Sequence, residues 1–216
     1  MDNPKEGIEL RGVPMKLAII TELFHPHIGG QEFRYLRLSY LLSKYGFKVY
    51  VFTIDYLGSL DAFENLNGVK IARYVKIPHY MGANRLPFNL LKTFNPRSLK
   101  GVAEYVWSTR ALIHKLMDEF DVIIINQSPL VHLFFLNVNG KSKKVVIDWV
   151  EYWNMIPFKV MMDEAIKRFK YFMVISEYID EAIRRINRRA ITSIIRTPLD
   201  AKLYEPRSNE KNSDMV

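Results

Sequence analysis

Two adjacent glycines near the start of the chain could bind an anion. The apolar stretch Leu17–Ile20 has the length and β-branched content of a buried strand, and the loop after it carries Gly29 and Gly30. Gln31 and Glu32 then open a predicted helix, placing an acceptor and a negative charge where free N–H groups favour them. A strand, a glycine pair and a helix N-terminus present backbone N–H groups with no side chain in the way. The pattern predicts a phosphate site; a plain tight turn is the alternative reading.

Two histidines in the same loop are further candidates for ligand contacts. His25 and His27 flank a proline just before the glycines and could bind a phosphate or a metal ion. No carboxylate stands at ligand spacing from them, so we predict no metal site. His27 and Glu32 are the candidate substrate contacts of this loop, and packing or surface histidines are the alternative.

Composition and charge restrict the class of protein. Of the 216 residues 49% are hydrophobic and 25% charged, which is typical of a globular protein, and no run approaches the roughly 18 apolar residues of a membrane span. The net charge of +8 favours anionic partners, but no zinc-finger, leucine-zipper or RNA-binding pattern supports nucleic acid. The absence of cysteine suits a reducing cytoplasm or a hot environment. Residues 1–14 lack the apolar core of a signal peptide and are expected to form a polar extension.

Apolar strand-like stretches alternate with helical stretches along the rest of the chain. The predicted strands are residues 17–20, 48–54, 69–75, 122–125, 144–149, 171–175 and 191–195. The predicted helices are residues 31–45, 98–120, 129–137, 162–170 and 177–189. The alternation predicts an α/β protein of Rossmann-like, doubly wound type, with a mostly parallel sheet of about seven strands and helices on both faces. Residues 15–200 would form this domain, followed by a linker or frayed tail at 201–216.

The glycine loop has the right place for a ligand in such a fold. Ligands bind doubly wound sheets at the carboxyl ends of the strands, near the switch in strand order. The loop from Phe24 to Gly30 follows the first predicted strand and would therefore lie at that edge.

The same stretch resembles the opening of a GT-B glycosyltransferase. Pro26 to Glu32 matches the pattern P-x-x-G-G-x-E of glycosyltransferase family 4, the glycogen-synthase-like retaining enzymes. The helix end at Gly46 and the strand ending in Thr53 continue the likeness, although Phe47 stands where that family usually has His. The resemblance implies the N-terminal half of a GT-B fold, in which the Gly29 and Gly30 amides stabilise the diphosphate of a nucleotide-diphosphate sugar.

Two later segments extend the resemblance toward candidate site residues. Phe120–Ile124 resembles the family's F-D-V-I-H, and Asn126 and Gln127 lie where a His is usual. Their amides can hydrogen-bond sugar hydroxyls. Ser128 and the proline after it are open to a second reading, as a cap for the next helix.

The segment 145–153 resembles a family stretch that ends in His-Glu or His-Asp before aromatic residues. Val150 stands at the position of that His and cannot accept a proton. Asp148 and Glu151 flank it and are the candidate catalytic carboxylates. The alternatives are a satisfied buried carboxylate for Asp148 and a solvated loop residue for Glu151.

The last matches lie near the C-terminus. Ser176 resembles a serine that ends a strand at the interdomain cleft of the family, and it would also cap the helix that begins at Glu177. Residues 194–206 resemble the crossing to a second domain, with Thr197 and Pro198 in place of Asn and Gly.

The resemblance implies an acceptor-binding domain of a retaining enzyme that moves a sugar to a hydroxyl acceptor, a glycan or a lipid-linked molecule. No bound cofactor is expected besides the donor, which an absent second domain would mostly hold, so the chain alone would be inactive. The alternative is a non-catalytic subunit or degenerate paralogue that pairs with a donor-binding chain or a membrane. Arg85–Lys100 mixes apolar and basic residues and suits peripheral contact with an anionic bilayer, or folds onto the sheet.

Overall fold

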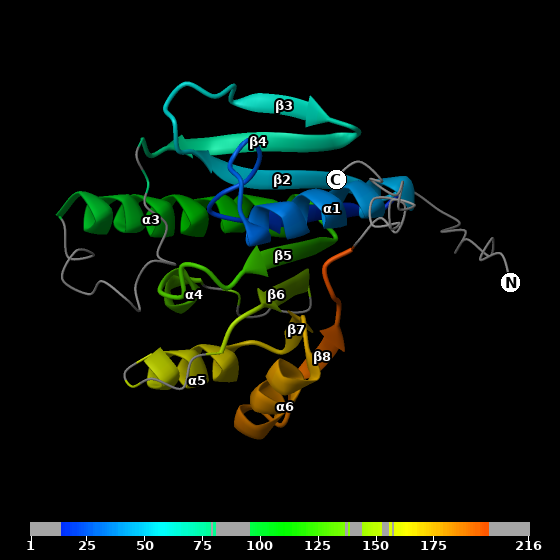
Figure 1. Ribbon diagram of the computed structural model, residues 1–216, viewed down its shortest axis with the longest axis vertical. Helices are drawn as coiled ribbons and strands as arrows, with labels where there is room; N and C mark the ends of the chain where they lie inside the picture. Colours follow the sequence, from blue (N-terminus) through cyan, green and yellow to red (C-terminus); the bar gives the residue numbers. More distant parts are fainter. Residues whose placement is uncertain are drawn as a thin grey trace, which may run out of the picture.

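A computed structural model describes residues 14–78, 80, 96–136, 138, 144–152, 156 and 158–198. Within these residues the chain forms one sheet of eight strands in the order β3-β4-β2-β1-β5-β6-β7-β8 (Figure 1). Every neighbouring pair is parallel except β3 and β4. The predicted Rossmann-like α/β fold with a mostly parallel sheet is therefore confirmed.

The strands and helices occupy nearly the predicted positions. The strands are β1 Lys16–Ile20, β2 Lys48–Asp55, β3 Phe63–Leu66, β4 Val69–Lys76, β5 Val122–Asn126, β6 Val145–Trp149, β7 Tyr171–Val174 and β8 Ile191–Ile194. The helices are α1 Gly30–Lys44, α3 Pro96–Glu119, α4 His132–Phe135, α5 Phe158–Arg168 and α6 Glu177–Ile186. None of these helices has both the length and the apolar content needed to span a bilayer.

Helices cover the sheet on both faces because its central strands are apolar on both sides. On one face Tyr35 and Leu38 of α1 pack on alternate residues of β1, β2 and β4, such as Ile19 and Val51. On the other face α3, α5 and α6 pack over the remaining alternate residues, including Ile20. This division follows from the pleat, which points successive side chains to opposite faces.

One strand was not predicted. Residues 63–66 are not among the predicted strands, but they form β3, which pairs antiparallel with β4. The turn between the strands consists of Asn67 and Gly68, both with positive φ (51° and 85°). An Asn-Gly pair supplies these angles at little steric cost and favours a two-residue hairpin. The crossover from β2 to β4 therefore contains a strand.

Helix boundaries account for the smaller differences. The predicted helix 177–189 ends at Ile186, because Asn187 leaves the helical conformation and its Nδ2 donates to the carbonyls of Ile166 and Phe169 at 3.0 and 2.8 Å. The predicted helix 129–137 shortens to α4, and α5 begins four residues before its predicted start. The predicted extension 1–14 up to Val13, the residues 85–95 and the tail from Leu199 lie outside the described residues.

Candidate functional site

The switch in strand order lies at β1. The chain places β2 on one side of β1 and β5 on the other, and the loops after β1, β5 and β6 leave from the same edge of the sheet. The N-terminus of α1 begins directly after the β1 loop. The predicted site residues of these loops therefore belong to one edge of the fold, as the general rule for doubly wound sheets requires.

The glycine loop is more closed than its sequence predicts. Gly29 is the extended N-cap of α1, and a Cβ built on it would lie 2.2 Å from Oε2 of Glu32. The Glu32 side chain thus folds back over its own helix N-terminus, where a negative charge is favoured, and is 8% exposed. His27 Nδ1 lies 3.1 Å from Glu32 Oε1. Gly30 differs, because a Cβ there would meet no atom within 4 Å. The space beside Gly29 is thus occupied by the Glu32 carboxylate, whereas the space beside Gly30 is open.

Asn126 joins three elements at this edge. Its Oδ1 accepts from Gln31 Nε2 at 2.8 Å and from the Ser128 backbone N–H at 3.1 Å. Its Nδ2 approaches Thr21 Oγ1 at 3.4 Å, and the residue is fully buried. Asn126 therefore fixes α1 and the loop after β1 to β5, while Gln31 remains half-buried at the rim.

Asp148 was either a catalytic carboxylate or a buried carboxylate whose hydrogen bonds are satisfied, and its surroundings agree with the second interpretation. It is fully buried at the end of β6, and its two oxygens accept from Arg34 Nε and Nη2 at 3.1 and 2.9 Å. Such a two-point pair is strong and directional, and it anchors α1 to the sheet. Both of its oxygens are engaged by the guanidinium, and the residue has no exposed surface through which a substrate could reach it.

Gln127 holds the loop that follows β6. Its Oε1 accepts from the backbone N–H groups of Val150 and Glu151 at 2.7 and 3.1 Å, and its Nε2 donates to the Glu151 carbonyl at 3.3 Å. The Glu151 side chain is exposed, and partial replacement of its water by protein raises the pKa of its carboxyl. Of the two predicted carboxylates, Glu151 is thus the accessible one.

Ser176 is a helix cap. It adopts an extended conformation before α6, and its Oγ accepts from the Ile179 backbone N–H at 3.4 Å. It follows β7, three strands from β1 in the sheet order, so the structure separates it from the glycine loop along the edge.

Sequence reasoning missed Glu22, the second residue after β1. Its side chain is 2% exposed, and its oxygens accept from Tyr80 Oη at 2.8 Å and from Ser128 Oγ at 3.0 Å. Burial raises its pKa from 4.5 to about 7, against the opposing effect of the two hydroxyl donors. An acidic residue two positions after the apolar run Leu17–Ile20 at the switch point was the signal that could have found it.

His132 is a second missed buried group, at the start of α4. Its Nδ1 contacts the Pro129 carbonyl, and its ring packs edge-on against Tyr105 with centroids 5.6 Å apart. Burial lowers its pKa from 6.5 to about 4, so the imidazole is neutral at pH 7. Within the described part of the chain, no three His, Asp or Glu side chains gather as they would around a metal ion.

Comparisons with known proteins find solved structures that have a similar fold. No protein-family profile and no curated protein matches the sequence. Among solved structures, sucrose-phosphate synthase from Thermosynechococcus elongatus is similar with a TM-score of 0.60 and 14% identity, over 89% of this chain and 50% of that one. Trehalose-6-phosphate synthase from E. coli, bound with UDP-2-fluoro glucose, is similar with a TM-score of 0.55 and 13% identity, over 87% of this chain and 50% of that one.

A shorter structure of sucrose-phosphate synthase from Thermosynechococcus elongatus is similar with a TM-score of 0.53 and 16% identity, over 88% of this chain and 93% of that one. The chain spans about half the length of the two longer structures. These structural neighbours are GT-B glycosyltransferases, and the chain shares their Rossmann-like α/β fold.

Proposed function

We propose that this chain is the acceptor-binding half of a retaining GT-B glycosyltransferase, which moves a sugar from a nucleotide-diphosphate sugar to a hydroxyl acceptor. The observation that carries the proposal is the shared fold over 89% of the chain. The UDP-sugar bound in the E. coli structure supports the donor class. A further domain or a second chain would supply most of the donor site, since this chain spans half of those structures.

The α1 N-terminus is the proposed contact for the leaving diphosphate. Gly30 is exposed and has open space where a side chain would be, so a phosphate oxygen can approach the first turn of the helix. Fixed backbone donors stabilise charge as it develops on a leaving group without having to reorient. The Glu32 carboxylate lies beside this position at Gly29 and would oppose the incoming negative charge, so it tunes the affinity.

The proposed acceptor contact is Glu151. It is the exposed carboxylate at the end of β6, and Gln127 fixes its backbone at the N–H and the carbonyl. A carboxyl with a raised pKa is closer to the operating range of a proton acceptor than an ordinary one. Asp148 and Arg34 act as a structural pair that positions α1, and Val150 provides no proton-transfer group.

Binding of UDP-glucose and of UDP, followed by calorimetry, tests the diphosphate contact. Gly30→Ala adds a methyl group beside the proposed phosphate position and is expected to weaken binding several-fold. Glu32→Gln removes the competing charge and is expected to strengthen it. Glu181→Gln, an exposed glutamate paired with Arg185 on α6, is the matched control and is expected to change nothing. Equal affinities for all four proteins would overturn the assignment.

Transfer activity tests the wider proposal. The chain mixed with a separately produced donor domain and a nucleotide sugar is expected to glycosylate a hydroxyl acceptor, and Glu151→Gln is expected to lower that rate. Turnover by the 216 residues alone would contradict the division of labour proposed here.

A further inference from the structure

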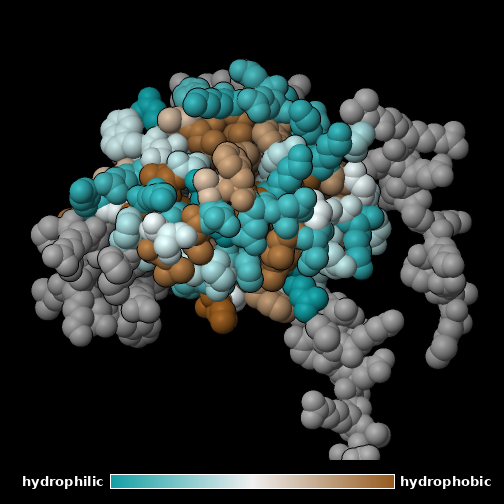
Figure 2. All heavy atoms as spheres, turned by 90° about the horizontal axis from the view of Figure 1, so that it is seen from above, coloured by the Kyte–Doolittle hydropathy of each residue, from teal (hydrophilic) through white to brown (hydrophobic). Residues whose placement is uncertain are grey.

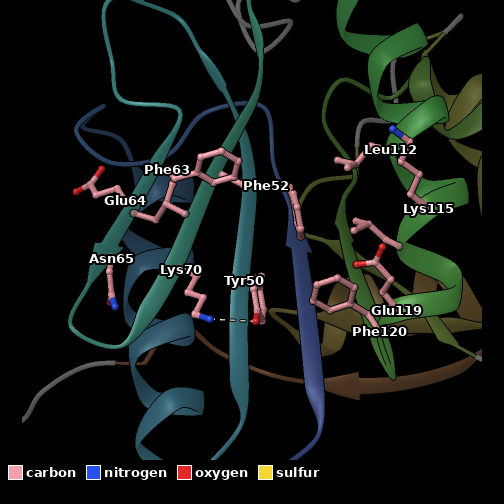
Figure 3. A pocket seen from close by; sticks show the side chains of 13 residues that line it. Tyr50, Phe52, Phe63, Glu64, Asn65, Lys70, Leu112, Lys115, Glu119 and Phe120 are labelled. Atoms are coloured by element: carbon pink, nitrogen blue, oxygen red, sulfur yellow. Dashed lines mark hydrogen bonds between the residues drawn. The ribbon is translucent and has the colours of Figure 1, made fainter.

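The helix α3 covers the sheet in two different ways along its length. Seen from the side of β3, the molecule shows apolar surface set among hydrophilic residues (Figure 2). Beside the C-terminal part of α3 lies an open groove, whose lining includes the exposed Glu119 (Figure 3). The part of α3 up to Thr109 instead closes over polar side chains, and Tyr105 and Thr109 are themselves 0% exposed. Water therefore reaches Glu119 but is excluded from the polar groups under the other part of the helix.

Glu22 belongs to this closed region. Tyr80 packs against the Tyr105 ring of α3, with centroids 6.1 Å apart, and its Oη donates to Glu22 Oε2 at 2.8 Å. The other carboxyl oxygen, Oε1, accepts from Ser128 Oγ at 3.0 Å, and 2% of the residue is exposed. A buried carboxyl to which the proposed transfer reaction assigns no part is thus held by two hydroxyl groups.

Hydrogen bonds connect Glu22 to the first turn of α1. The Ser128 backbone N–H donates to Asn126 Oδ1 at 3.1 Å, and Gln31 Nε2 donates to the same oxygen at 2.8 Å. Gln31 directly follows Gly30, where open space allows the proposed approach of the diphosphate. The chain of residues from Glu22 through Ser128 and Asn126 to Gln31 therefore leads from the buried carboxyl to the proposed phosphate contact.

The two hydroxyl partners allow Glu22 to be either charged or neutral. A hydroxyl group can donate to a carboxylate and can also accept from a protonated carboxyl, because its hydrogen rotates. Asp148 lacks this freedom, since the Arg34 guanidinium that engages it can only donate. Protonation of Glu22 therefore leaves the heavy atoms of Tyr80 and Ser128 in place, and the connection to α1 is kept.

The described groups that act on Glu22 are negative or neutral. They are one carboxyl and four phenols: Glu32 and Tyr35 of α1, Tyr74 of β4, Tyr105 of α3, and Tyr80. Burial raises the pKa of each of these phenols, so all four are neutral near pH 7. His132, which packs against Tyr105, is neutral as well, because burial lowers its pKa to about 4. Burial raises the pKa of Glu22 to about 7, and the Glu32 charge at the α1 N-terminus adds to this effect. A diphosphate at the same helix end would act in the same direction, since like charges disfavour ionisation.

We propose that Glu22 is a positioning residue of the donor site, and that it takes up a proton from the solvent when a nucleotide-diphosphate sugar binds at the α1 N-terminus. This inference rests on the proposed function, because that ligand is the donor assigned to this helix end. The new O–H bond forms on a Glu22 oxygen and donates to Ser128 or Tyr80, so Gln31 keeps its place next to Gly30. The protonated form binds the donor more tightly, because one negative charge near the diphosphate is removed.

Calorimetric titration with UDP-glucose between about pH 6 and 8.5, in buffers of different ionisation enthalpy, measures both the affinity and the protons taken up. Each phosphate of UDP-glucose carries a single, strongly acidic group, so the ligand itself keeps its charge over this range. The affinity is expected to fall several-fold as the pH rises, since a rise of the Glu22 pKa by about one unit sets a limit of about tenfold. Glu22→Gln keeps partners for both hydroxyls and is expected to bind equally well at every pH, without proton uptake.

Three further variants separate Glu22 from its neighbours. Ser128→Ala removes a hydroxyl that lowers the Glu22 pKa, so the affinity is expected to fall at a higher pH than in the wild type; this variant serves if Glu22→Gln does not fold. His27→Gln is expected to retain the proton uptake, and Glu181→Gln on α6 is the matched control, with the profile of the wild type.

The outcomes distinguish this inference from the function on which it rests. Proton uptake that persists in Glu22→Gln or disappears in His27→Gln, an unshifted profile in Ser128→Ala, or a wild-type affinity that does not change with pH would each overturn the role of Glu22 alone. Absence of UDP-glucose binding at every pH would overturn the diphosphate contact itself, and this inference with it.

Discussion

Two buried carboxylates lie at the same edge of the sheet and are treated in opposite ways by the fold. Asp148, at the end of β6, is held by the Arg34 guanidinium through two hydrogen bonds. Glu22, just after β1, accepts from the hydroxyls of Tyr80 and Ser128. Burial raises the pKa of Glu22 to about 7, because hydroxyl donors compensate lost hydration less than a cation does. One carboxylate therefore anchors a helix, and the other titrates near neutral pH.

This contrast separates structure from chemistry within the candidate site. Asp148, one of the two candidate catalytic carboxylates, holds α1 and is fully buried. The group that sequence reasoning passed over has the perturbed pKa that often accompanies functional sites.

The largest effect is expected from breaking the ion pair. Arg34→Met leaves the Asp148 charge buried without its partner, which lowers the free energy of unfolding by about 3–5 kcal/mol. Urea unfolding followed by circular dichroism measures it. Arg37→Met on the same helix is the control, since Arg37 packs over the Phe33 ring. The double variant Arg34→Met, Asp148→Leu should regain most of the loss. A cost no greater than that of Arg37→Met would contradict the assignment.

Glu22→Gln is expected to change how stability depends on pH. The folded state holds the Glu22 proton up to about pH 7, whereas the ordinary pKa is 4.5. The contribution of Glu22 to the free energy of unfolding is therefore largest below pH 4.5 and falls by about 3 kcal/mol as the pH rises to 7. Glu22→Gln removes this loss and should be more stable than the wild type at pH 8. Urea unfolding between pH 5 and 8, at about one-unit steps, measures the difference. An unchanged profile would show that Glu22 does not bind a proton on folding.

His132→Gln should produce a similar effect with the opposite sign. The buried imidazole has its pKa lowered to about 4, whereas the ordinary value is 6.5. As the pH is lowered, His132 of the unfolded chain therefore binds a proton before His132 of the folded chain does. The free energy of unfolding falls by about 3 kcal/mol as the pH drops from 6.5 to 4. The glutamine amide can still donate to the Pro129 carbonyl, so the variant should lose only the acid-side slope. His114→Gln, an exposed histidine on α3, is the control. If the free energy of unfolding of the variant still falls between pH 6.5 and 4 as in the wild type, other groups cause that pH dependence.

The smallest effect is expected at the rim of the site. Gln31→Met removes the 2.8 Å hydrogen bond to Asn126, which retains the Ser128 backbone donor. The expected loss in the free energy of unfolding is about 1 kcal/mol. Lys44→Met in the last turn of the same helix is the control. A loss comparable to that of Arg34→Met would show that the amide network, and not the ion pair, fixes α1.

Much of the fold follows from local pattern. The apolar runs of β1, β5 and β6 are too short for helices and too apolar for loops, so their type and order could be predicted. The hairpin at Asn67-Gly68 was missed because polar residues precede it, although its turn signal was present. Local pattern also predicted the Ser176 cap, whose partner lies only three residues away.

The site could be predicted only in part. The loops were identified, but the partner of Asp148 is 114 residues away in the sequence and the partners of Asn126 include a residue 95 away. Gln127 was read as a sugar contact, yet its amide is used by the backbone of the next loop. The folded-back position of Glu32 depends on the absence of a side chain at Gly29, because a Cβ there would clash with the Glu32 carboxylate.

The sequence by itself determined a parallel α/β sheet with a glycine loop at its carboxyl edge, because periodicity, caps and turns act over a few residues. Only the tertiary structure decided which polar groups are available for chemistry. A carboxylate becomes an anchor, a proton binder or an accessible ligand contact according to its burial and the charge packed against it, and those neighbours come from distant parts of the chain.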